Sequence, residues 1–264
     1  MSSPAERMAA RPAAEISIAA LAGIPMVRPG DSIAELILHG LAASGLALQR
    51  GDLLVIAQKI VSKAEARQVD LRTVTPSARA LALATEVDKD ARLVELILRE
   101  STEVVRHRKG VLVVAHRSGI VLANAGIDAS NVAGDDSQVL LLPEDCNRSC
   151  RDIRARLSAR TGIEAGVLII DSLGRAWRNG TVGVALGAAG LPALLDLRGE
   201  PDLFGRELRS TQVGIADEIA AAASLLMGQA DQGTPVVLLR GLNLPGADGS
   251  ADDLIRARDL DLFR

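Results

Sequence analysis

Aromatic side chains are nearly missing from this chain of 264 residues, which has one Trp, two Phe and no Tyr. Its core must therefore be filled by Ala, Val, Leu and Ile. Proteins that bind single-stranded nucleic acid stack the bases on several aromatic side chains, so this class of function is disfavoured. The formal net charge of −3 also supplies no basic field for DNA or for a membrane surface.

Cysteine and long hydrophobic runs are scarce as well. The two cysteines, Cys146 and Cys150, lie on a predicted helix and imply neither a disulfide framework nor a zinc site, and the three histidines are scattered. The most apolar long stretch, residues 182–195, is shorter than a membrane span and contains Pro192. Residues 1–15 lack the apolar segment of a signal peptide, so we expect a disordered tail and a cytoplasmic protein.

Two common nucleotide-binding motifs are also missing. No Gly-x-Gly occurs anywhere, which excludes the Rossmann fingerprint. No Gly-Lys pair occurs either, which excludes a P-loop. Any nucleotide site must therefore use another architecture.

The hydrophobic pattern predicts an α+β fold with mixed, largely antiparallel sheets and helices packed on them. The capping-box spacing of Ser32 and Glu35 predicts a helix that ends near Ser44. Further helices are expected over 76–90, 91–100, 144–160 and 211–228, and strands over 52–57, 111–115, 119–123, 138–142, 167–170 and 235–240. We expect one domain over 16–245, with two intertwined subdomains as the alternative, and a loosely attached C-terminal tail over 246–264.

Three segments contain residues suited to chemistry, and each also has a purely structural interpretation. In the first, residues 58–63 (QKIVSK) follow a predicted strand, where a lysine is well placed to meet phosphate, although a solvated loop fits the spacing as well. The second is the polar loop 124–131, in which Asp128 offers carboxylate oxygens to a hard cation such as Mg²⁺ or Mn²⁺. An Asx-turn without a ligand is the alternative for this loop.

The third segment is the apolar run 167–170, which leads directly into Asp171 and Ser172. An acid and a hydroxyl at the end of a strand can hold a metal near phosphate, but they can equally cap a helix. If Asp128 and Asp171 meet beside a lysine, the three groups would form a clamp for metal and phosphate. The sequence alone does not show whether they meet.

These three segments, in this order, resemble the coenzyme F-420:L-glutamate ligase family. The resemblance extends from about residue 18 to residue 243. It also takes in the segments 23–31 (GIPMVRPGD), 103–106 (EVVR), 202–208 (DLFGREL) and 216–218 (ADE).

The resemblance implies a GTP-dependent ligase that adds L-glutamate to the terminal carboxylate of a deazaflavin coenzyme precursor, through an acyl phosphate. It implies Mg²⁺ or Mn²⁺, with two ions bound, and it allows K⁺ as a further cation. It also implies a homodimer without a C-terminal nitroreductase-like domain. Neither a nucleic acid nor a membrane is expected as a partner.

The resemblance also assigns roles to individual residues. Asp128 and Asp171 correspond to ligands of the first metal, and Ser172 and Gln229 lie at the positions of the second. The neutral amide of Gln229 stands where some relatives have a carboxylate. Lys63 corresponds to a phosphate-binding lysine, so that Lys63, Asp128 and Asp171 form the expected catalytic set. The remaining nucleotide-binding positions are Ile24, Pro25, Met26, Val27, Gln58, Asn131, Met227, Gly228, Gln229, Ala230, Asp231, Gln232, Gly233 and Thr234.

Two alternatives stay open at the level of sequence. One is a related amide ligase with a different acid or amino-acid substrate, because the substrate end leaves no recognisable pattern. The other is a nucleotide-binding protein without catalytic activity. Arg148, Arg151, Arg154, Arg156 and Arg160 on the helix over 144–160 indicate either a solvated face or part of a funnel for anionic substrates.

Overall fold

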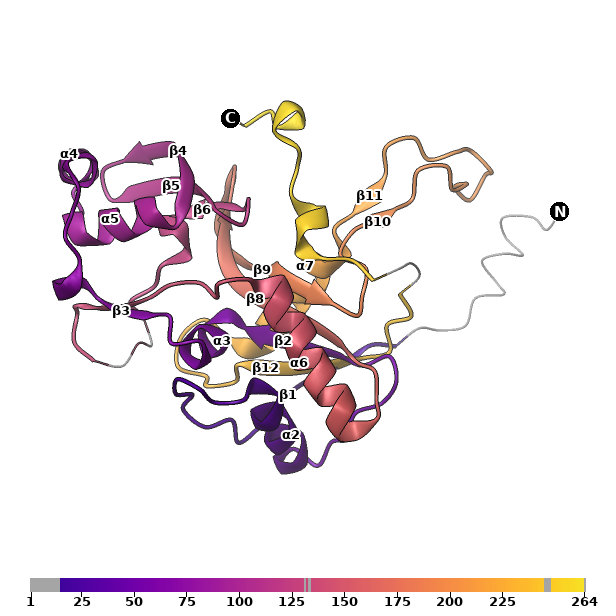
Figure 1. Cartoon of the computed structure of the whole chain (residues 1–264). Helices are drawn as coiled ribbons and strands as arrows, with labels where there is room; N and C mark the ends of the chain where they lie inside the picture. The colour runs from indigo at the N-terminus through magenta and orange to yellow at the C-terminus, as the bar shows by residue number, and fades with distance from the viewer. Residues whose placement is uncertain (1–14, 131, 133, 245–247, 264) are drawn as a thin grey trace.

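A computed structural model describes residues 15–130, 132, 134–244 and 248–263. The predicted N-terminal tail thus lies outside the described residues, apart from Glu15. Figure 1 shows a central sheet with helices on its faces, a smaller lobe beside it and an arm that projects from the other side. This arrangement confirms the predicted α+β class with mixed, largely antiparallel sheets.

The central sheet has five strands in the order β1-β12-β2-β8-β9. Its strands are β1 (Ser17–Ala20), β2 (Leu53–Ala57), β8 (Gly166–Arg175), β9 (Arg178–Ala189) and β12 (Val236–Arg240). Only β2 and β8 pair in parallel, whereas the other three pairings are antiparallel. The carboxyl ends of β2 and β8 therefore lie at the same edge of the sheet.

Helices cover both faces of this sheet. They are α2 (Ile33–Ala43), α3 (Gln58–Ala64) and α6 (Cys146–Thr161) on one face and α7 (Ile215–Met227) on the other. The central strand β2 shows why both faces are covered: Leu54 and Ile56 belong to the core under α2 and α6, while Leu53 and Val55 belong to the core under α7. Buried apolar side chains on both faces explain the continuous apolar run of this strand.

The smaller lobe has a core of its own. It contains α4 (Ala78–Val87), α5 (Ala91–Arg99) and a three-stranded antiparallel sheet of β4 (Ser101–Arg108), β5 (Val111–His116) and β6 (Val121–Ala123). A two-stranded sheet of β3 (Gln68–Asp70) and β7 (Gln138–Leu140) connects the lobe to the central sheet. Both chain passages into the lobe thus run through paired strands.

The arm seen at the upper right of Figure 1 carries the short strands β10 (Leu195–Asp196) and β11 (Gln212–Val213). The 3-10 turns are η1 (Leu71–Thr73), η2 (Asn124–Gly126), η3 (Ala251–Leu254) and η4 (Arg258–Leu260). Within the part of the chain described, no helix is long and apolar enough to cross a membrane.

The helix starts agree well with the sequence predictions, with small shifts at the ends. Ser32 caps α2 as predicted and accepts a hydrogen bond from the backbone N–H of Glu35. The helix predicted from Pro76 instead begins after Ser77, whose side chain caps it. The strand β4 was not predicted, because its exposed and half-buried positions do not alternate regularly and two register shifts interrupt its pairing.

One strand is longer than predicted: β8 continues past Asp171, because β9 goes on pairing with it as far as Arg175. Residues 58–63 form most of the helix α3, so the alternative of a solvated loop does not apply to them. In the C-terminal segment, Ala251 is buried, and Arg258 forms an ion pair with Glu103 on β4.

Glycines on β9 allow helices to lie directly on the strand. A Cβ atom at Gly183 would overlap the backbone of Ala220 on α7, and one at Gly187 would overlap the backbone of Cys146 at the start of α6. The two glycines therefore serve close packing on opposite faces of the same strand.

We predict that Gly187→Ala destabilises the protein by about 1–3 kcal/mol, because the added methyl group has no room against a helix backbone. Urea unfolding followed by circular dichroism measures the change. Gly174→Ala on the neighbouring strand is the control, since a Cβ atom there meets no other heavy atom within 4 Å. Equal stability of the two variants would contradict the packing role.

Candidate functional site

The segments named by the sequence analysis converge at one edge of the central sheet. In the parallel pair, Ala57 at the end of β2 lies opposite Ile170 on β8. The next residues along the two strands are Gln58, which begins α3, and Asp171. The parallel pairing therefore brings the first and third candidate segments side by side.

Two more candidate segments leave the sheet at the same edge. The backbone N–H of Leu21, just after β1, donates to the carbonyl oxygen of Val236 at 2.9 Å, and the N–H of Ala57 donates to Pro235 at 2.8 Å. Residues 24–27 follow the first contact, and residues 227–234 precede the second. Both expected nucleotide-binding segments thus start from the edge that holds Asp171.

An ion pair brings the remaining segment to this edge. Lys59 Nζ, on the first turn of α3, lies 2.6 Å from the Asp128 carboxylate and donates to the Ser130 hydroxyl at 2.8 Å. Asp128 is held in place by a backbone bridge to Leu140 on β7. Its carboxylate also accepts the N–H of Ser130 at 2.7 Å, so the Asx-turn considered as an alternative is present as well.

The pKa values of the two carboxyl groups are shifted in opposite directions. Burial opposes ionisation of Asp128, but the hydrogen bonds from Lys59 and Ser130 outweigh it and lower the pKa. Burial raises the pKa of Asp171 to about 6, and the negative charge of Asp128 adds to this rise while Lys59 counters it. The two side chains are therefore close enough to interact electrostatically with each other and with the same ammonium group.

The donors available at this edge fit a hard divalent cation. Asp171 is a largely dehydrated carboxyl group, and its surroundings only partly stabilise the ionised form. A bound cation would stabilise this form further. Across the described residues, this edge included, no group of three or more His, Cys, Asp or Glu side chains is arranged to hold a metal. A cation bound by Asp128 and Asp171 would therefore complete its coordination with water and substrate oxygens.

Helix α3 contributes two further polar side chains. Gln58 is buried, its Oε1 accepts from the Ser62 hydroxyl at 2.8 Å, and its Nε2 has no hydrogen-bond partner among the residues that the structure describes. Lys63 lies one turn beyond Lys59, and burial followed by repulsion from Lys59 lowers its pKa. A lysine in this condition favours a site where an anion restores its charge.

Other expected residues lie less favourably. Asn131 lies outside the described residues. Ser172 follows Asp171 within a regular strand, so the pleat directs its hydroxyl to the opposite face of the sheet. Gln229 is exposed in the loop after α7. This loop lies at the same edge of the sheet as Asp171. The second metal site therefore has fewer suitable ligand atoms than the first.

Sequence reasoning missed Lys59 as a member of the site. Only the resemblance singled out a lysine in the first segment, and it pointed to Lys63. The available indication was that two of the four lysines in the chain lie in this one short segment. The segment forms a helix, and this helix directs the side chain of Lys59 toward Asp128, which makes Lys59 a member of the site.

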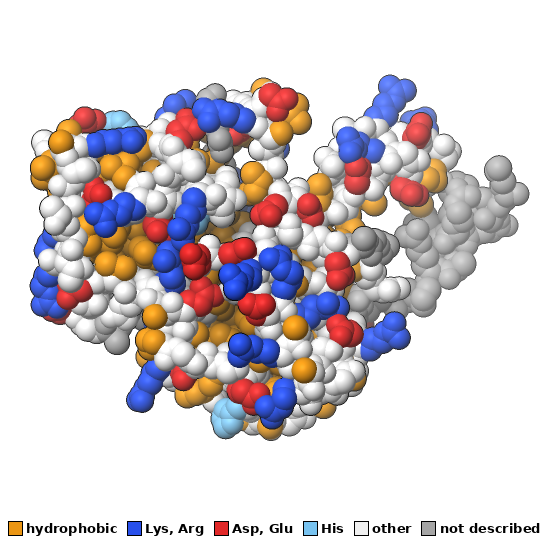
Figure 2. All heavy atoms as spheres, in the orientation of Figure 1, with side chains coloured by type: hydrophobic (Ala, Val, Ile, Leu, Met, Phe, Trp, Pro, Cys, Tyr) orange, Lys and Arg blue, Asp and Glu red, His pale blue; other side chains and the backbone are white. Residues whose placement is uncertain are grey.

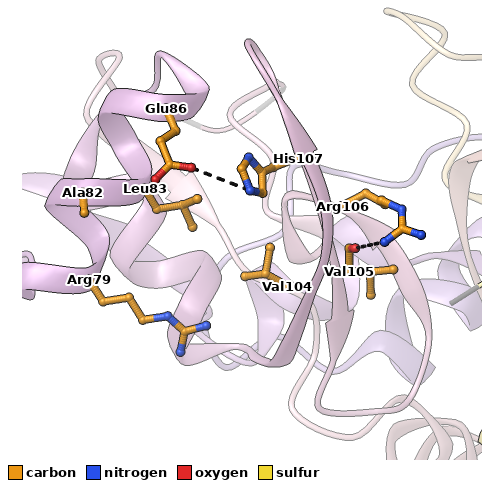
Figure 3. A pocket seen from close by; sticks show the side chains of 8 residues that line it. All are labelled: Arg79, Ala82, Leu83, Glu86, Val104, Val105, Arg106 and His107. Carbon is orange, nitrogen blue, oxygen red and sulfur yellow. Dashed lines mark hydrogen bonds and ion pairs between the residues drawn. The ribbon is translucent and has the colours of Figure 1, made fainter.

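A separate open depression lies on the smaller lobe, away from these residues. It has a volume of about 560 Å³ and lies between α4 and β4 (Figure 3). Glu86 and His107 form an ion pair across it at 3.7 Å, and Arg106 donates to the carbonyl oxygen of Val105. On the face shown in Figure 2, acidic and basic side chains are interspersed, as expected for a chain of small net charge.

Comparison with known sequences identifies the chain as a ligase. It is 47% identical to the coenzyme F420:L-glutamate ligase of Methanothermobacter thermautotrophicus over 251 residues, which cover 94% of this chain and 99% of the relative. The corresponding ligase of Methanopyrus kandleri is 47% identical, with 90% and 93% covered. The one of Methanocaldococcus jannaschii is 42% identical, with 82% and 86% covered.

The chain belongs to the F420-0:gamma-glutamyl ligase family, whose model matches residues 23–241. This confirms the family that the sequence motifs indicated. The matched region contains the whole edge described above, from the segment 24–27 to the loop before β12.

We predict a pH-dependent effect of Asp171→Asn on the stability of the metal-free protein. The pKa of Asp171 is about 6 in the folded protein and about 3.9 in an unfolded chain, so ionisation opposes folding increasingly between these values. The variant should therefore be more stable than the wild type at pH 8, and the difference should vanish near pH 4. Urea unfolding in the presence of a chelator measures it.

Asp128→Asn is the matched control with the opposite sign, because the folded-state pKa of Asp128 is lowered. Its ionised form stabilises the folded protein, and this contribution is lost as the pH falls through the folded pKa. Asp128→Asn should thus destabilise the protein more at pH 8 than at low pH. The same sign for both variants would contradict the electrostatics described for this edge.

Proposed function

We propose that the protein uses GTP and a divalent cation to join L-glutamate to the terminal carboxylate of a deazaflavin coenzyme precursor, and that it does so in the cytoplasm. The names of the relatives, coenzyme F420:L-glutamate ligase, support the two substrates. The observation that carries the proposal is the meeting of Asp128, Asp171 and Lys59 at one edge of the sheet. This is the combination of charges that a metal-bound triphosphate requires.

The reaction needs activation, because a carboxylate and an amine do not condense in water. In the proposed route, a carboxylate oxygen of the precursor forms a bond to the γ-phosphorus of GTP while the bond to GDP breaks. The amine nitrogen of glutamate then attacks the carbonyl carbon of this acyl phosphate, loses a proton, and phosphate leaves with its bridging oxygen. The protein contributes by placing the reactants and neutralising their charge.

The residues at the edge divide this work in the proposal. Asp128 and Asp171 would hold the cation, Mg²⁺ or Mn²⁺, which neutralises phosphate charge when it is bound. Lys63 would meet the phosphates, whose negative charge would stabilise the charged form that burial disfavours. Lys59 would stay beside Asp128 and keep it ionised. Ser172 and Gln229 would serve a second ion only weakly, since one hydroxyl faces away and the other side chain is a neutral amide.

We predict that Asp128→Asn and Lys63→Met each lower the rate of glutamate ligation at least a hundredfold, measured by mass spectrometry of the product with GTP, Mn²⁺, glutamate and the deazaflavin precursor. The first change removes a carboxylate ligand, and the second removes a phosphate-facing charge. Lys109→Met and Asp135→Asn are controls of the same types at exposed positions of the chain.

Wild-type protein that yields neither ligated product nor GDP under these conditions would contradict the proposal as a whole. If the wild type is active and Asp128→Asn retains its rate, the assignment of the metal ligand is wrong. If only Lys59→Met, and not Lys63→Met, changes the GTP dependence, the phosphate contact belongs to Lys59.

The homodimer belongs to this proposal too, with the arm as the contact between two copies. Phe204 at its tip is 77% exposed, and Leu203 beside it is also exposed. Hydrogen bonds within the loop nevertheless fix its conformation, because the Asp202 carboxylate accepts the N–H groups of Phe204 and Arg206, each at 2.8 Å. A structured loop that presents apolar side chains away from the body is suited to a second copy of the chain.

We predict that Phe204→Ser shifts the protein from dimer toward monomer, because it removes the largest apolar side chain of the arm. Size-exclusion chromatography with light scattering gives the mass of each species. Leu81→Ser, at an exposed apolar position on α4, is the control and should leave the mass unchanged. A monomeric wild type, or a fully dimeric Phe204→Ser variant, would contradict the role of the arm.

A further inference from the structure

A cavity of about 500 Å³ lies between the smaller lobe, the start of α6 and strand β9. This volume is in the range of small-molecule sites, roughly 300–1,000 Å³. The walls come from four parts of the chain, namely the turn after β5, the segment 142–147, β9 and the C-terminal η3 region. None of the lining residues belongs to the metal and phosphate set described above.

One end of the cavity is cationic. His116 and Arg117 line it, and both lie next to the buried carboxylate of Glu100. Arg117 and Arg67 each form an ion pair with Glu100, at 3.1 and 2.8 Å. Burial opposes ionisation of Glu100, but His116 and the two arginines outweigh it and lower its pKa. Two guanidinium groups thus share one carboxylate, which leaves a net positive charge at this end.

His116 presents an unused donor. The residue is 2% exposed, and its Nδ1 accepts the backbone N–H of Ser118 at 3.1 Å. A neutral ring that accepts at Nδ1 carries its hydrogen on Nε2. This Nε2 has no hydrogen-bond partner within the described residues, and its nearest carboxylate oxygen, on Glu100, is 3.7 Å away. Because this Nε2 is shielded from solvent and faces Glu100, His116 fixes the wall of the cavity, and Arg117, whose side chain is 38% exposed, is the cationic group that a ligand can reach.

The other end of the cavity is acidic and adjoins the metal and phosphate edge. Glu144, Asp145 and Cys146 line it at the start of α6. Burial raises the pKa of the Cys146 thiol to about 12, and the charges of Glu65, Asp145 and Asp171 add to this rise. Gly187 on β9 lies against the backbone of Cys146 and pairs with Ile169 on β8, two residues before Asp171, which connects this end of the cavity with the site of the proposed phosphoryl transfer.

The C-terminal segment closes the cavity on one side. The buried amide of Asn147 accepts the backbone N–H groups of Ala188 at 3.1 Å and of Ala251 at 3.0 Å, and it donates to the Asp252 carboxylate at 3.0 Å. These bonds join β9, α6 and η3 around one side chain. The cavity thus has fixed walls and does not depend on a loose surface loop.

We propose that this cavity binds the amino-acid substrate, a small zwitterion with an additional side-chain carboxylate. Its carboxylates would lie at Arg117, and its ammonium group would lie toward Asp145 and the edge that holds Asp171. The cationic and acidic side chains in its walls match the opposite charges of such a molecule, and the Arg117 guanidinium is a donor suited to a carboxylate. The inference rests on the proposed ligase function and specifies where that function takes its amine.

The arrangement has a chemical consequence. The amine nitrogen is the atom that attacks the activated acid, so it must lie beside the phosphate-bearing end of the other substrate. The carboxylates must lie away from it, because their charge would repel the phosphates. A cavity whose cationic residue, Arg117, and acidic residue, Asp145, come from different walls satisfies both requirements. The space that one amino acid leaves unfilled would admit the end of the precursor.

The test measures the KM for glutamate, the KM for GTP and kcat in Arg117→Met and His116→Phe. We expect the KM for glutamate to rise about tenfold or more in each variant, with the KM for GTP little changed. Tenfold corresponds to about 1.4 kcal/mol of binding free energy. L-Glutamine in place of L-glutamate should show a smaller loss in Arg117→Met, because it lacks the side-chain charge.

Arg99→Met is the matched control. Arg99 lies in the same lobe and forms an ion pair at 2.9 Å with Glu95, whose side chain is 11% exposed, close to the 10% of Glu100. This variant loses the same kind of ion pair outside the cavity and should keep the wild-type KM for glutamate. Thermal unfolding of all variants shows whether any change comes from loss of fold.

Calorimetric titration of the protein with L-glutamate alone gives a second readout that needs no turnover. Weaker binding in Arg117→Met than in Arg99→Met supports the proposal. An unchanged KM for glutamate in both cavity variants of an active enzyme overturns it, as does a rise confined to the KM for GTP or for the acid. A wild type without ligase activity would instead contradict the proposed function, and the two failures are therefore distinguishable.

Discussion

The ion pair between Lys59 and Asp128 joins the two halves on which the site depends. Lys59 belongs to the helix that leaves the central sheet, and Asp128 belongs to the loop that returns from the smaller lobe. The same ammonium also lowers the pKa of Asp171, which burial and the charge of Asp128 raise. Without a positive charge at this point, two carboxylates would face each other in a partly dehydrated edge, and one of them would have to take up a proton.

The topology of the sheet explains why this charge can act on both acids. A single parallel pair, β2 with β8, places two carboxyl ends at one edge, and the antiparallel neighbours β12 and β1 bring their loops to the same edge. Parallel strands need a long crossover between them, and in this chain the crossover contains the whole smaller lobe. The segment that carries Asp128 lies within that crossover and is tied back to it by the bridge to Leu140.

The fold was largely predictable, because caps and apolar periodicity are local. Ser32 predicts the start of its helix, and the apolar run before Gln58 predicts the central strand. The helix α3 was not predicted, since seven residues carry too little periodicity, and β8 was predicted too short because its extension depends on β9. At the site, Asp128 and Asp171 were identified by resemblance to a family. Lys59 and His116 gain their significance only from tertiary neighbours, which no spacing in the sequence reveals.

The glycines of β9 connect the two sides of the sheet mechanically. With Gly183 against the backbone of α7 and Gly187 against the first residue of α6, both helices lie directly on this strand, one on each face. Close-packed interiors transmit displacement and do not absorb it. A small shift of α7, which leads into the loop 227–234, would therefore be passed to the start of α6 and to the wall formed by Cys146. The nucleotide segment and the proposed amine-binding cavity thus share a rigid link across the sheet.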